Sequence, residues 1–173
     1  LVFPLLQALR ELFGSMPLLS FLSSFRYPLS GEFAADASFI CRLGLAADWG
    51  LEIGFLCELF RHAPAQRICQ VDLGNNFDHK HQHLGTHPRT GEPDAVGGLL
   101  RMAEEVTWNL LSHLWTQPGF ASESRRLETV ADAYLGTAQQ LLRRYGHEMI
   151  FNGLEDSVQE EKRAVVAFAK IVR

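Results

Sequence analysis

The chain has 173 residues, 47% of them hydrophobic, and a formal net charge of −4 at pH 7. This length and hydrophobic content are typical of one globular unit with a substantial core, and the negative charge argues against nucleic-acid binding, which needs a concentrated basic face. The three cysteines, Cys41, Cys57 and Cys69, form no CxxC pair. Such scattered cysteines are typical of buried thiols in a reducing compartment, so we expect a cytoplasmic protein.

The N-terminal segment begins with the letters LVFP instead of methionine, and we therefore expect a fragment or a processed product of a longer protein. Its apolar run ends at Arg10, which is too early to span a bilayer. Apolar residues at helical spacing predict an amphipathic helix over 3–14, with Pro4 in its first turn and Gly14 at its end. No membrane partner is expected.

The next segment predicts short elements around a turn. Residues 15–25 are apolar and Ser-rich, which indicates a short helix or strand followed by a turn. In 26–34, Pro28 favours extended backbone before it and Gly31 accepts a positive φ. A short helix is predicted for 34–43. An extended segment, a tight turn and a helix N-terminus together present backbone N–H groups that can bind an anion.

Residues 48–60 predict a helix with Asp48 as its N-cap. Its apolar stripe consists of Trp49, Ile53, Leu56 and Phe60. Glu52 lies in the first turn among apolar neighbours, and two interpretations are open. The carboxylate is favoured there by the helix dipole, which spacing alone prefers, or it belongs to a functional site in a pocket.

A histidine-rich stretch follows a predicted strand over 67–73, whose residues alternate and favour β structure. His79, His81 and His83 recur at every second position, so on an extended segment they would lie on one side. With His87 they could form a zinc site. Alternatively, one histidine completes a Mg²⁺ or Mn²⁺ site and the others contact an anionic substrate. A surface loop with chance histidines is the third interpretation.

The rest of the chain predicts a loop over 84–93 and then helices. The helical segments run from Asp94 to a break at Pro118, over 122–145 and over 157–172, with a turn or short helix over 146–153. Their apolar stripes are expected to pack in a core or between domains.

Four motifs carry a resemblance to a known family. The letters PLSGEFA (28–34), WGLEIG (49–54), QVDLG (70–74) and DHKHQ (78–82) occur in this order. They resemble the C-terminal half of the retaining glucosyl-3-phosphoglycerate synthases and their glycosyltransferase relatives. The resemblance implies an α/β fold, the C-terminal part of a GT-A (Rossmann-like) fold with few strands and a mainly helical C-terminal extension. Residues 1–93 would be the acceptor- and metal-binding half, and 94–173 the helical extension.

The implied activity is metal-dependent transfer of a hexosyl group, glucose, from a nucleotide sugar to a small anionic acceptor such as 3-phosphoglycerate. Retention at the anomeric carbon, a Mg²⁺ or Mn²⁺ cofactor and a homodimer are expected with it. His79 matches the family's metal-binding histidine, Glu52 matches the carboxylate of the sugar pocket, and Leu29 matches a backbone position near the reacting centre. The implied substrate-binding positions are Gly31, Glu32 and His81.

The chemistry explains these residue types. A divalent metal stabilises the leaving diphosphate, and a carboxylate near the sugar holds its hydroxyls or stabilises positive charge at the anomeric carbon. Backbone N–H groups near Leu29 and Gly31 could face the reacting groups. Glu52 is not assigned as a nucleophile, because the donor's phosphate oxygen can take the acceptor proton.

Two departures from the family pattern change the expectation. The sequence contains no Asp-x-Asp metal motif and no glycine-rich phosphate loop near its start. In addition, His81 stands where the family commonly has asparagine, which leaves the identity of the acceptor open. We therefore expect the chain to be inactive by itself. Two alternatives remain: a non-catalytic helical interaction or dimerisation module, and a histidine-rich zinc-binding domain.

Overall fold

The computed structural model describes residues 1–74, 84–86, 93–153 and 158–173. Its α-helices are α1 (Val2–Phe13), α2 (Pro17–Leu22), α3 (Ala37–Ile40), α4 (Leu51–His62), α5 (Gly98–Trp115), α6 (Val130–Phe151) and α7 (Val158–Val172). Two 3₁₀ helices are η1 (Ala65–Arg67) and η2 (Ala121–Thr129). The described strands, β1 (Leu84–Thr86) and β2 (Pro93–Gly97), form an antiparallel pair with Thr86 opposite Pro93. This mostly helical chain fits the predicted helical extension.

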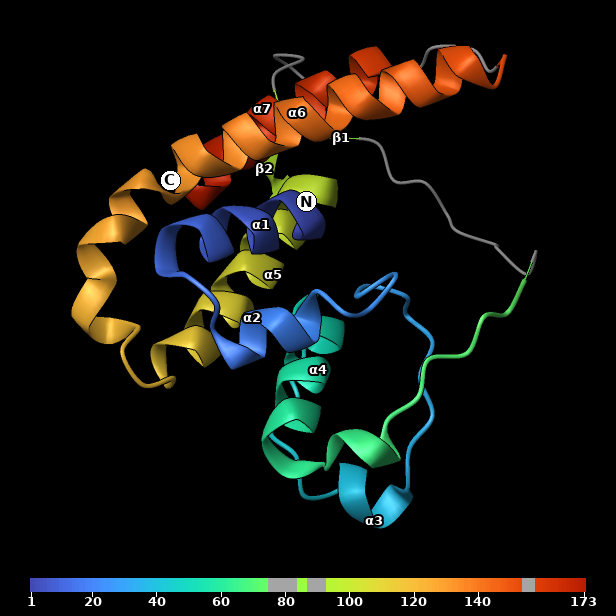
Figure 1. The fold of residues 1–173 in the computed structure, drawn as a ribbon, viewed down its shortest axis with the longest axis vertical. Coiled ribbons are helices and arrows are strands. Elements are labelled where there is room, and N and C mark those ends of the chain that lie inside the picture. The colour runs from blue at the N-terminus through green and yellow to red at the C-terminus, as the bar shows by residue number, and fades with distance from the viewer. Residues whose placement is uncertain (75–83, 87–92, 154–157) are drawn as a thin grey trace.

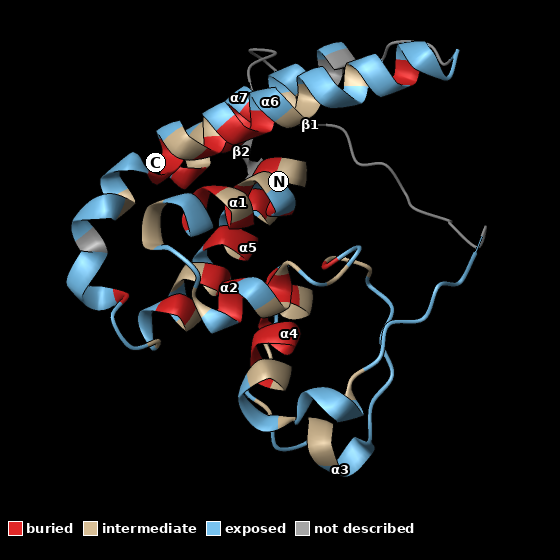
Figure 2. Ribbon diagram, in the orientation of Figure 1, coloured by how far each residue is buried: buried red, intermediate tan, exposed pale blue. Residues whose placement is uncertain are grey.

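One hydrophobic core joins helices from the two ends of the chain. α1 packs against α6, α6 packs against α7, and both α4 and α7 pack against α5. Figure 2 shows the buried stretches on the inner faces of these helices. Their buried residues recur every three or four positions, as Leu5 and Leu9 do on α1 and Leu110 and Leu114 on α5. The core draws on both predicted domains, and the division at residue 93 stays a prediction.

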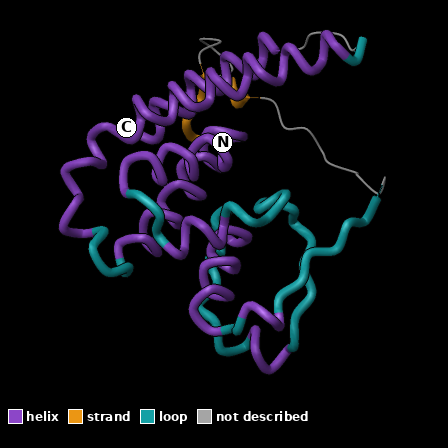
Figure 3. Tube along the Cα trace, viewed as in Figure 1, coloured by secondary structure: helices purple, strands orange, loops and turns teal. Residues whose placement is uncertain are grey.

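The arrangement separates a helical side from a looped side. α6 and α7 lie side by side along one edge, and α3 lies at the opposite end beyond α4 (Figure 1). The described loops before and after α4 lie to one side of that helix, away from most of the other helices (Figure 3). None of the described helices is long and apolar enough to cross a membrane. The three motifs that the structure describes, PLSGEFA, WGLEIG and QVDLG, thus lie on the looped side, on α4 or near it.

Several predicted helices are confirmed with different limits. α1 ends where predicted, because Gly14 adopts a φ of 77°. α4 begins at Leu51 with Gly50 as its N-cap. Asp48 lies two residues before this N-cap, and its Oδ1 instead accepts the Gly50 N–H at 2.8 Å. Trp49, which was expected on the apolar stripe, is 43% exposed.

The C-terminal helices differ from the prediction in where they break. α5 begins at Gly98 because β2 occupies the residues before it. The predicted helix over 122–145 is divided into η2 and α6, and Glu123 inside η2 has non-helical angles (φ −102°, ψ 15°). α6 then continues through Gly146 to Phe151, where a turn or short helix was predicted. A glycine inside a helix costs only about 1 kcal/mol, which packing can offset.

The predicted strand over 67–73 is wrong. η1 ends at Arg67, and the following residues through Leu73 lie in no described strand or helix. Val71 and Leu73 are 73% and 52% exposed. The alternating apolar side chains of this segment therefore do not pack against a sheet. β propensity reflects packing on a sheet, and it has no effect where that neighbour is missing.

The prediction of buried thiols holds for one cysteine of three. Cys57 on α4 is fully buried, and burial raises the pKa of its thiol to about 12, with a further contribution from the neighbouring Glu58 charge. Cys41 and Cys69 are exposed. Both follow short helical turns whose residues contribute no side chain to the core, so composition alone could not separate them from Cys57.

Candidate functional site

The first turn of α4 carries Glu52, which is half-buried. The N-cap residue is Gly50, which has no side chain that could accept a hydrogen bond from the N–H groups of the first turn of α4. The N–H groups just before the helix are bound instead by nearby carboxylates: Trp49 N–H donates to Glu105 Oε2 at 2.9 Å, and Gly50 N–H donates to Asp48 Oδ1 at 2.8 Å. Negative charge is favourable at a helix N-terminus, so the start of α4 is an energetically favourable place for carboxylates.

The turn at Gly31 lies against Glu52. Gly31 has a φ of 70°, a conformation that favours glycine. A Cβ placed on Gly31 would lie 3.8 Å from Glu52 Oε1. Next to it, Ser30 Oγ donates to the carbonyl of Glu32 at 3.2 Å. Two of the motifs found in the sequence, PLSGEFA and WGLEIG, therefore lie next to each other in space.

Apolar contacts on both sides hold this turn in place. The Phe33 ring stacks on Phe55 of α4, with ring centroids 4.4 Å apart and an interplanar angle of 27°. Leu29, before the turn, is partly buried against the hydrophobic core. Such aromatic pairs contribute about 0.5–1.5 kcal/mol beyond the area that they bury. The turn is thus fixed to the helix that carries Glu52.

The third motif lies beside the segment that leads into the turn. The Gln70 side chain donates from Nε2 to the Ser24 carbonyl at 3.0 Å and accepts the Arg26 N–H at 2.9 Å. Arg26 and Asp72 form an ion pair at 3.4 Å whose side chains are both largely exposed, so it adds little stability. The Gln70 amide is therefore the main polar link between these two loops.

The histidine motif itself falls outside the described residues. His79, His81 and His83 lie within 75–83, so their predicted roles in metal and acceptor binding stay predictions. Within the described ranges, no group of three or more His, Cys, Asp or Glu side chains is placed to hold a metal ion. The described residues alone therefore do not fit a divalent cation.

The Glu52 carboxylate is available for a ligand. It has no hydrogen-bond or ion-pair partner among the residues that the structure describes, and it faces a glycine turn instead of an apolar wall. Gly31 and Glu32 are exposed. A carboxylate of this kind can accept hydrogen bonds from the hydroxyls of a sugar, and the adjoining turn can offer backbone N–H donors.

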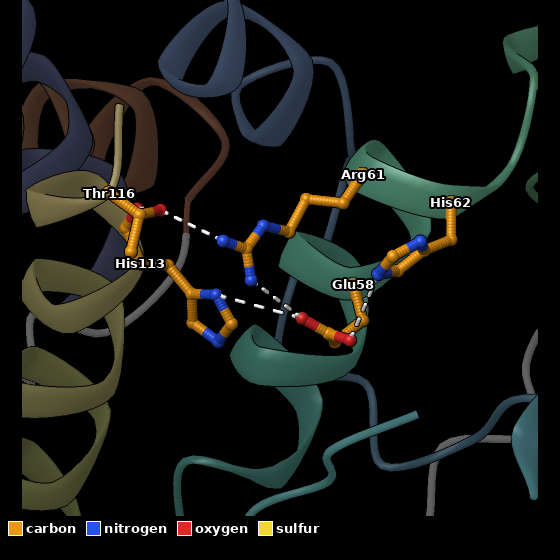
Figure 4. A network of polar contacts seen from close by, with 5 residues as sticks. All are labelled: Glu58, Arg61, His62, His113 and Thr116. Carbon is orange, nitrogen blue, oxygen red and sulfur yellow. Dashed lines mark hydrogen bonds and ion pairs between the residues drawn. The ribbon is translucent and has the colours of Figure 1, made fainter. Parts of the chain in front are cut away.

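A second polar cluster lies at the other end of α4 and was missed in the sequence (Figure 4). Glu58 is only 7% exposed. Its Oε1 lies 3.2 Å from Arg61 Nη1 and 4.0 Å from His113 Nδ1, and its Oε2 lies 3.6 Å from His62 Nε2. Arg61 Nη2 also donates to Thr116 Oγ1 at 3.1 Å. These contacts tie the C-terminal half of α4 to the end of α5.

The sequence held a partial signal for this cluster. Glu58 interrupts the apolar letters FLCELF, and Arg61 and His62 follow it at the helical spacings that bring side chains together. His113 comes from another helix, and no local pattern links it to Glu58. Burial lowers the pKa of His113, while the Glu58 charge acts in the opposite direction.

An apolar cavity of about 1050 Å³ lies elsewhere, between α1, α6 and α7. Its lining includes Leu6, Arg10, Tyr145 and Phe168. Of the predicted site residues that the structure describes, Leu29, Gly31, Glu32 and Glu52, none contributes to it. The candidate site is therefore the surface formed by the Gly31 turn and Glu52, and not this cavity.

Comparison with known proteins gives relatives of one kind. No protein-family model and no solved structure matches the chain. The chain is 35% identical over 174 residues to a glucosyl-3-phosphoglycerate synthase of Methanococcoides burtonii and 32% identical over 170 residues to one of Persephonella marina. A shorter match, 38% over 71 residues, is to a glucosyl-3-phosphoglycerate synthase of Mycobacterium tuberculosis and covers 41% of the chain and 19% of that protein.

The extent of these matches confirms the resemblance found in the motifs. Each of the first two matches covers 98% of the chain and 40% of the relative. The chain is thus similar over nearly its whole length to glucosyl-3-phosphoglycerate synthases, of which it spans about 40%.

Proposed function

We propose that the chain forms part of a retaining, metal-dependent glycosyltransferase with a GT-A catalytic fold. It would transfer a hexosyl group, glucose, from a nucleotide sugar to a small anionic acceptor such as 3-phosphoglycerate. The observation that carries this proposal is the closeness of the Gly31 turn to Glu52, since a Cβ placed on Gly31 would lie 3.8 Å from Glu52 Oε1. Similarity to glucosyl-3-phosphoglycerate synthases over 98% of the chain supports it.

Glu52 is the residue to which we assign the sugar. Its unpartnered carboxylate would accept hydrogen bonds from sugar hydroxyls and stabilise the positive charge that develops at the anomeric carbon. The backbone near Leu29 and Gly31 would face the reacting groups, and Glu32 would border the substrate. Because these groups are held by the Phe33–Phe55 stack, their geometry is set before the substrate binds.

His79 is the proposed protein ligand of Mg²⁺ or Mn²⁺, and His81 the proposed contact for the acceptor's negative charge. The metal would supply electrostatic stabilisation of the departing diphosphate. Its remaining ligands would have to come from a part of the enzyme that the described residues do not provide, which is why the chain by itself is expected to be inactive. A homodimer and a cytoplasmic location complete the proposal.

A chimera tests this function. The chain would replace the matching 40% of the Persephonella marina synthase, and transfer of glucose from nucleotide sugars to 3-phosphoglycerate would be measured with and without Mg²⁺. We expect metal-dependent transfer, and a fall in kcat of about 100-fold or more in Glu52→Gln, the size typical of a lost transition-state interaction. The matched control is Glu104→Gln, which changes an exposed carboxylate on α5.

Two results would contradict the proposal. One is a folded chimera that transfers no sugar to 3-phosphoglycerate or to related phosphorylated acids. The other is Glu52→Gln activity equal to that of Glu104→Gln, which would remove Glu52 from the sugar pocket.

A further inference from the structure

We propose that Glu105 on α5 is a positioning residue that fixes the first turn of α4 and, through that turn, Glu52. This inference rests on the proposed function, because placement of Glu52 matters to the reaction only if Glu52 contacts the sugar. Its basis is one hydrogen bond between segments far apart in the sequence: Trp49 N–H donates to Glu105 Oε2 at 2.9 Å.

The glycine N-cap makes this bond important. A helix start is normally bound by the side chain of its N-cap residue, and such a bond contributes about 0.5–2 kcal/mol. Gly50 has no side chain to do so. Glu105 therefore acts from a neighbouring helix, on the N–H just before the N-cap, three residues ahead of Glu52.

Both oxygens of Glu105 are in use, which fixes its orientation. Oε1 accepts a hydrogen bond from Arg101 Nε at 2.7 Å, one turn earlier on α5, while Oε2 accepts the Trp49 N–H. The hydrogen bond from Trp49, followed by that from Arg101, lowers the pKa of the Glu105 carboxyl. The carboxylate is thus ionised at neutral pH and has a single favoured geometry.

Asn109, one turn beyond Glu105, fixes the sideways position of the same helix. A Cβ on Gly50 would lie 2.7 Å from Asn109 Cβ, and a Cβ on Gly54 would lie 2.7 Å from Asn109 Oδ1. Both distances are shorter than real Cβ contacts, so the glycines allow α4 and α5 to approach. Asn109 Oδ1 is itself buried without a hydrogen-bond partner in the described structure. The close packing of α4 on α5 thus comes with the energetic cost of one buried oxygen that forms no hydrogen bond.

The consequence for the site follows from distance. Glu52 Oε1 lies 3.8 Å from the position that a Cβ would take on Gly31, and the Phe33–Phe55 stack holds the turn against the next helical turn of α4. If the start of α4 moves by about 1 Å, the carboxylate no longer meets the sugar in the productive geometry, and such misplacement can cost on the order of 100-fold in rate.

The test compares two substitutions of Glu105 in the chimera described above. Glu105→Gln keeps an amide oxygen that can accept the Trp49 N–H, whereas Glu105→Ala keeps none. We expect Glu105→Ala to lower kcat by about 10-fold or more, with less than about a three-fold change in KM for the acceptor. Glu105→Gln should recover most of that loss. Glu104→Ala, at the adjacent exposed position, is the matched control and should leave kcat unchanged.

Arg101→Ala provides a second variant if Glu105→Ala does not fold. Arg101 is exposed, so its loss should leave the core intact, and we expect a smaller fall in kcat in the same direction. In the 173-residue chain itself, hydrogen exchange at the Trp49 amide should be faster in Glu105→Ala than in Glu104→Ala, and close to the parent rate in Glu105→Gln.

The outcomes separate this inference from the proposed function. If Glu52→Gln is as active as the parent chimera, the proposed function fails whatever Glu105 does. If Glu52→Gln is impaired but Glu105→Ala and Glu104→Ala are equally active, Glu105 does not position the site. If Glu105→Gln is as impaired as Glu105→Ala, the charge of Glu105 acts directly, and the account based on its hydrogen bond is wrong.

Discussion

Two glutamates on one helix have opposite surroundings. Glu52, in the first turn of α4, is half-buried and has no partner among the described residues. Glu58, six positions later, is almost fully buried and lies within 4.0 Å of an arginine and two imidazoles. Both stand among apolar letters in the sequence, so the apolar pattern cannot tell them apart. The partners of the two carboxylates distinguish them. A carboxylate that already has ion-pair partners within the protein has a structural role, and a carboxylate without such partners can bind a ligand.

The largest expected difference between these glutamates is in stability. Glu58→Ala would leave Arg61 and His113 without their carboxylate, and we expect it to lower the free energy of unfolding by about 2–3 kcal/mol. Glu52→Ala breaks no hydrogen bond or ion pair among the described residues, and its effect should stay within about 1 kcal/mol, the size of a helix-dipole interaction. Urea unfolding of the two variants measures the difference. Equal losses would mean that Glu52 is also a structural carboxylate.

The glycine contacts at the Glu52 end provide a sharper test of how α4 is placed. Gly50→Ala should cost about 1–3 kcal/mol, because its methyl group meets Asn109 Cβ. Adding Asn109→Ala should not rescue it, since that Cβ remains. Gly54→Ala meets only the end of the Asn109 side chain, so Asn109→Ala should rescue it fully, with up to about 1 kcal/mol gained from helix propensity.

Thermal or urea unfolding of the four variants checks this prediction. Rescue of Gly50→Ala by Asn109→Ala would show that the two helices can separate without loss, and the sideways role assigned to Asn109 would then be wrong.

These helix-to-helix contacts mark the limit of what the sequence predicts. Periodicity and glycine stops predicted α1, α4 and α7 with nearly correct limits, and four short motifs predicted the family resemblance. The resemblance assigned Gly31 and Glu52 to one substrate site, but no pattern in the sequence predicted how close they lie. The bond from Trp49 to Glu105 joins segments 56 positions apart, and no local pattern encodes it.

The strand error has the same origin. The letters at 67–73 have a β pattern, but a strand forms only where a neighbouring strand accepts its backbone bonds. In the structure the partner of this segment is the loop at Ser24 and Arg26, reached through the Gln70 side chain. Sequence predicts local preference well, and it does not show which remote segment will be nearby.

The smallest effect predicted is the pH dependence at the Glu58 end. Burial lowers the pKa of His113 below its usual value of 6.5, against the influence of Glu58 and with that of Arg61. At a pH between the pKa of His113 in the folded chain and its pKa in the unfolded chain, the unfolded chain binds more protons. The stability that the neutral imidazole contributes is therefore complete above pH 6.5, and it is lost as the pH falls through the pKa of the folded chain.

Unfolding free energies measured between pH 7.5 and 5 should therefore decrease toward acid, with a smaller slope in His113→Gln. His62→Gln, which removes the more exposed imidazole beside Glu58, is the matched substitution for comparison. If His113→Gln leaves the slope unchanged, another group is responsible for the acid sensitivity.

The Gln70 amide has a consequence for which substitutions the site tolerates. It contacts the backbone of Ser24 and Arg26 and neither of their side chains. Residue identity at these two positions is therefore free to vary without breaking the link, whereas position 70 needs one donor and one acceptor at the reach of a glutamine. Glutamate there would keep only the acceptor, and asparagine would be one methylene too short. Related sequences should then have many different residues at positions 24 and 26 and few at position 70. This difference is expected where a side chain binds backbone groups and not other side chains.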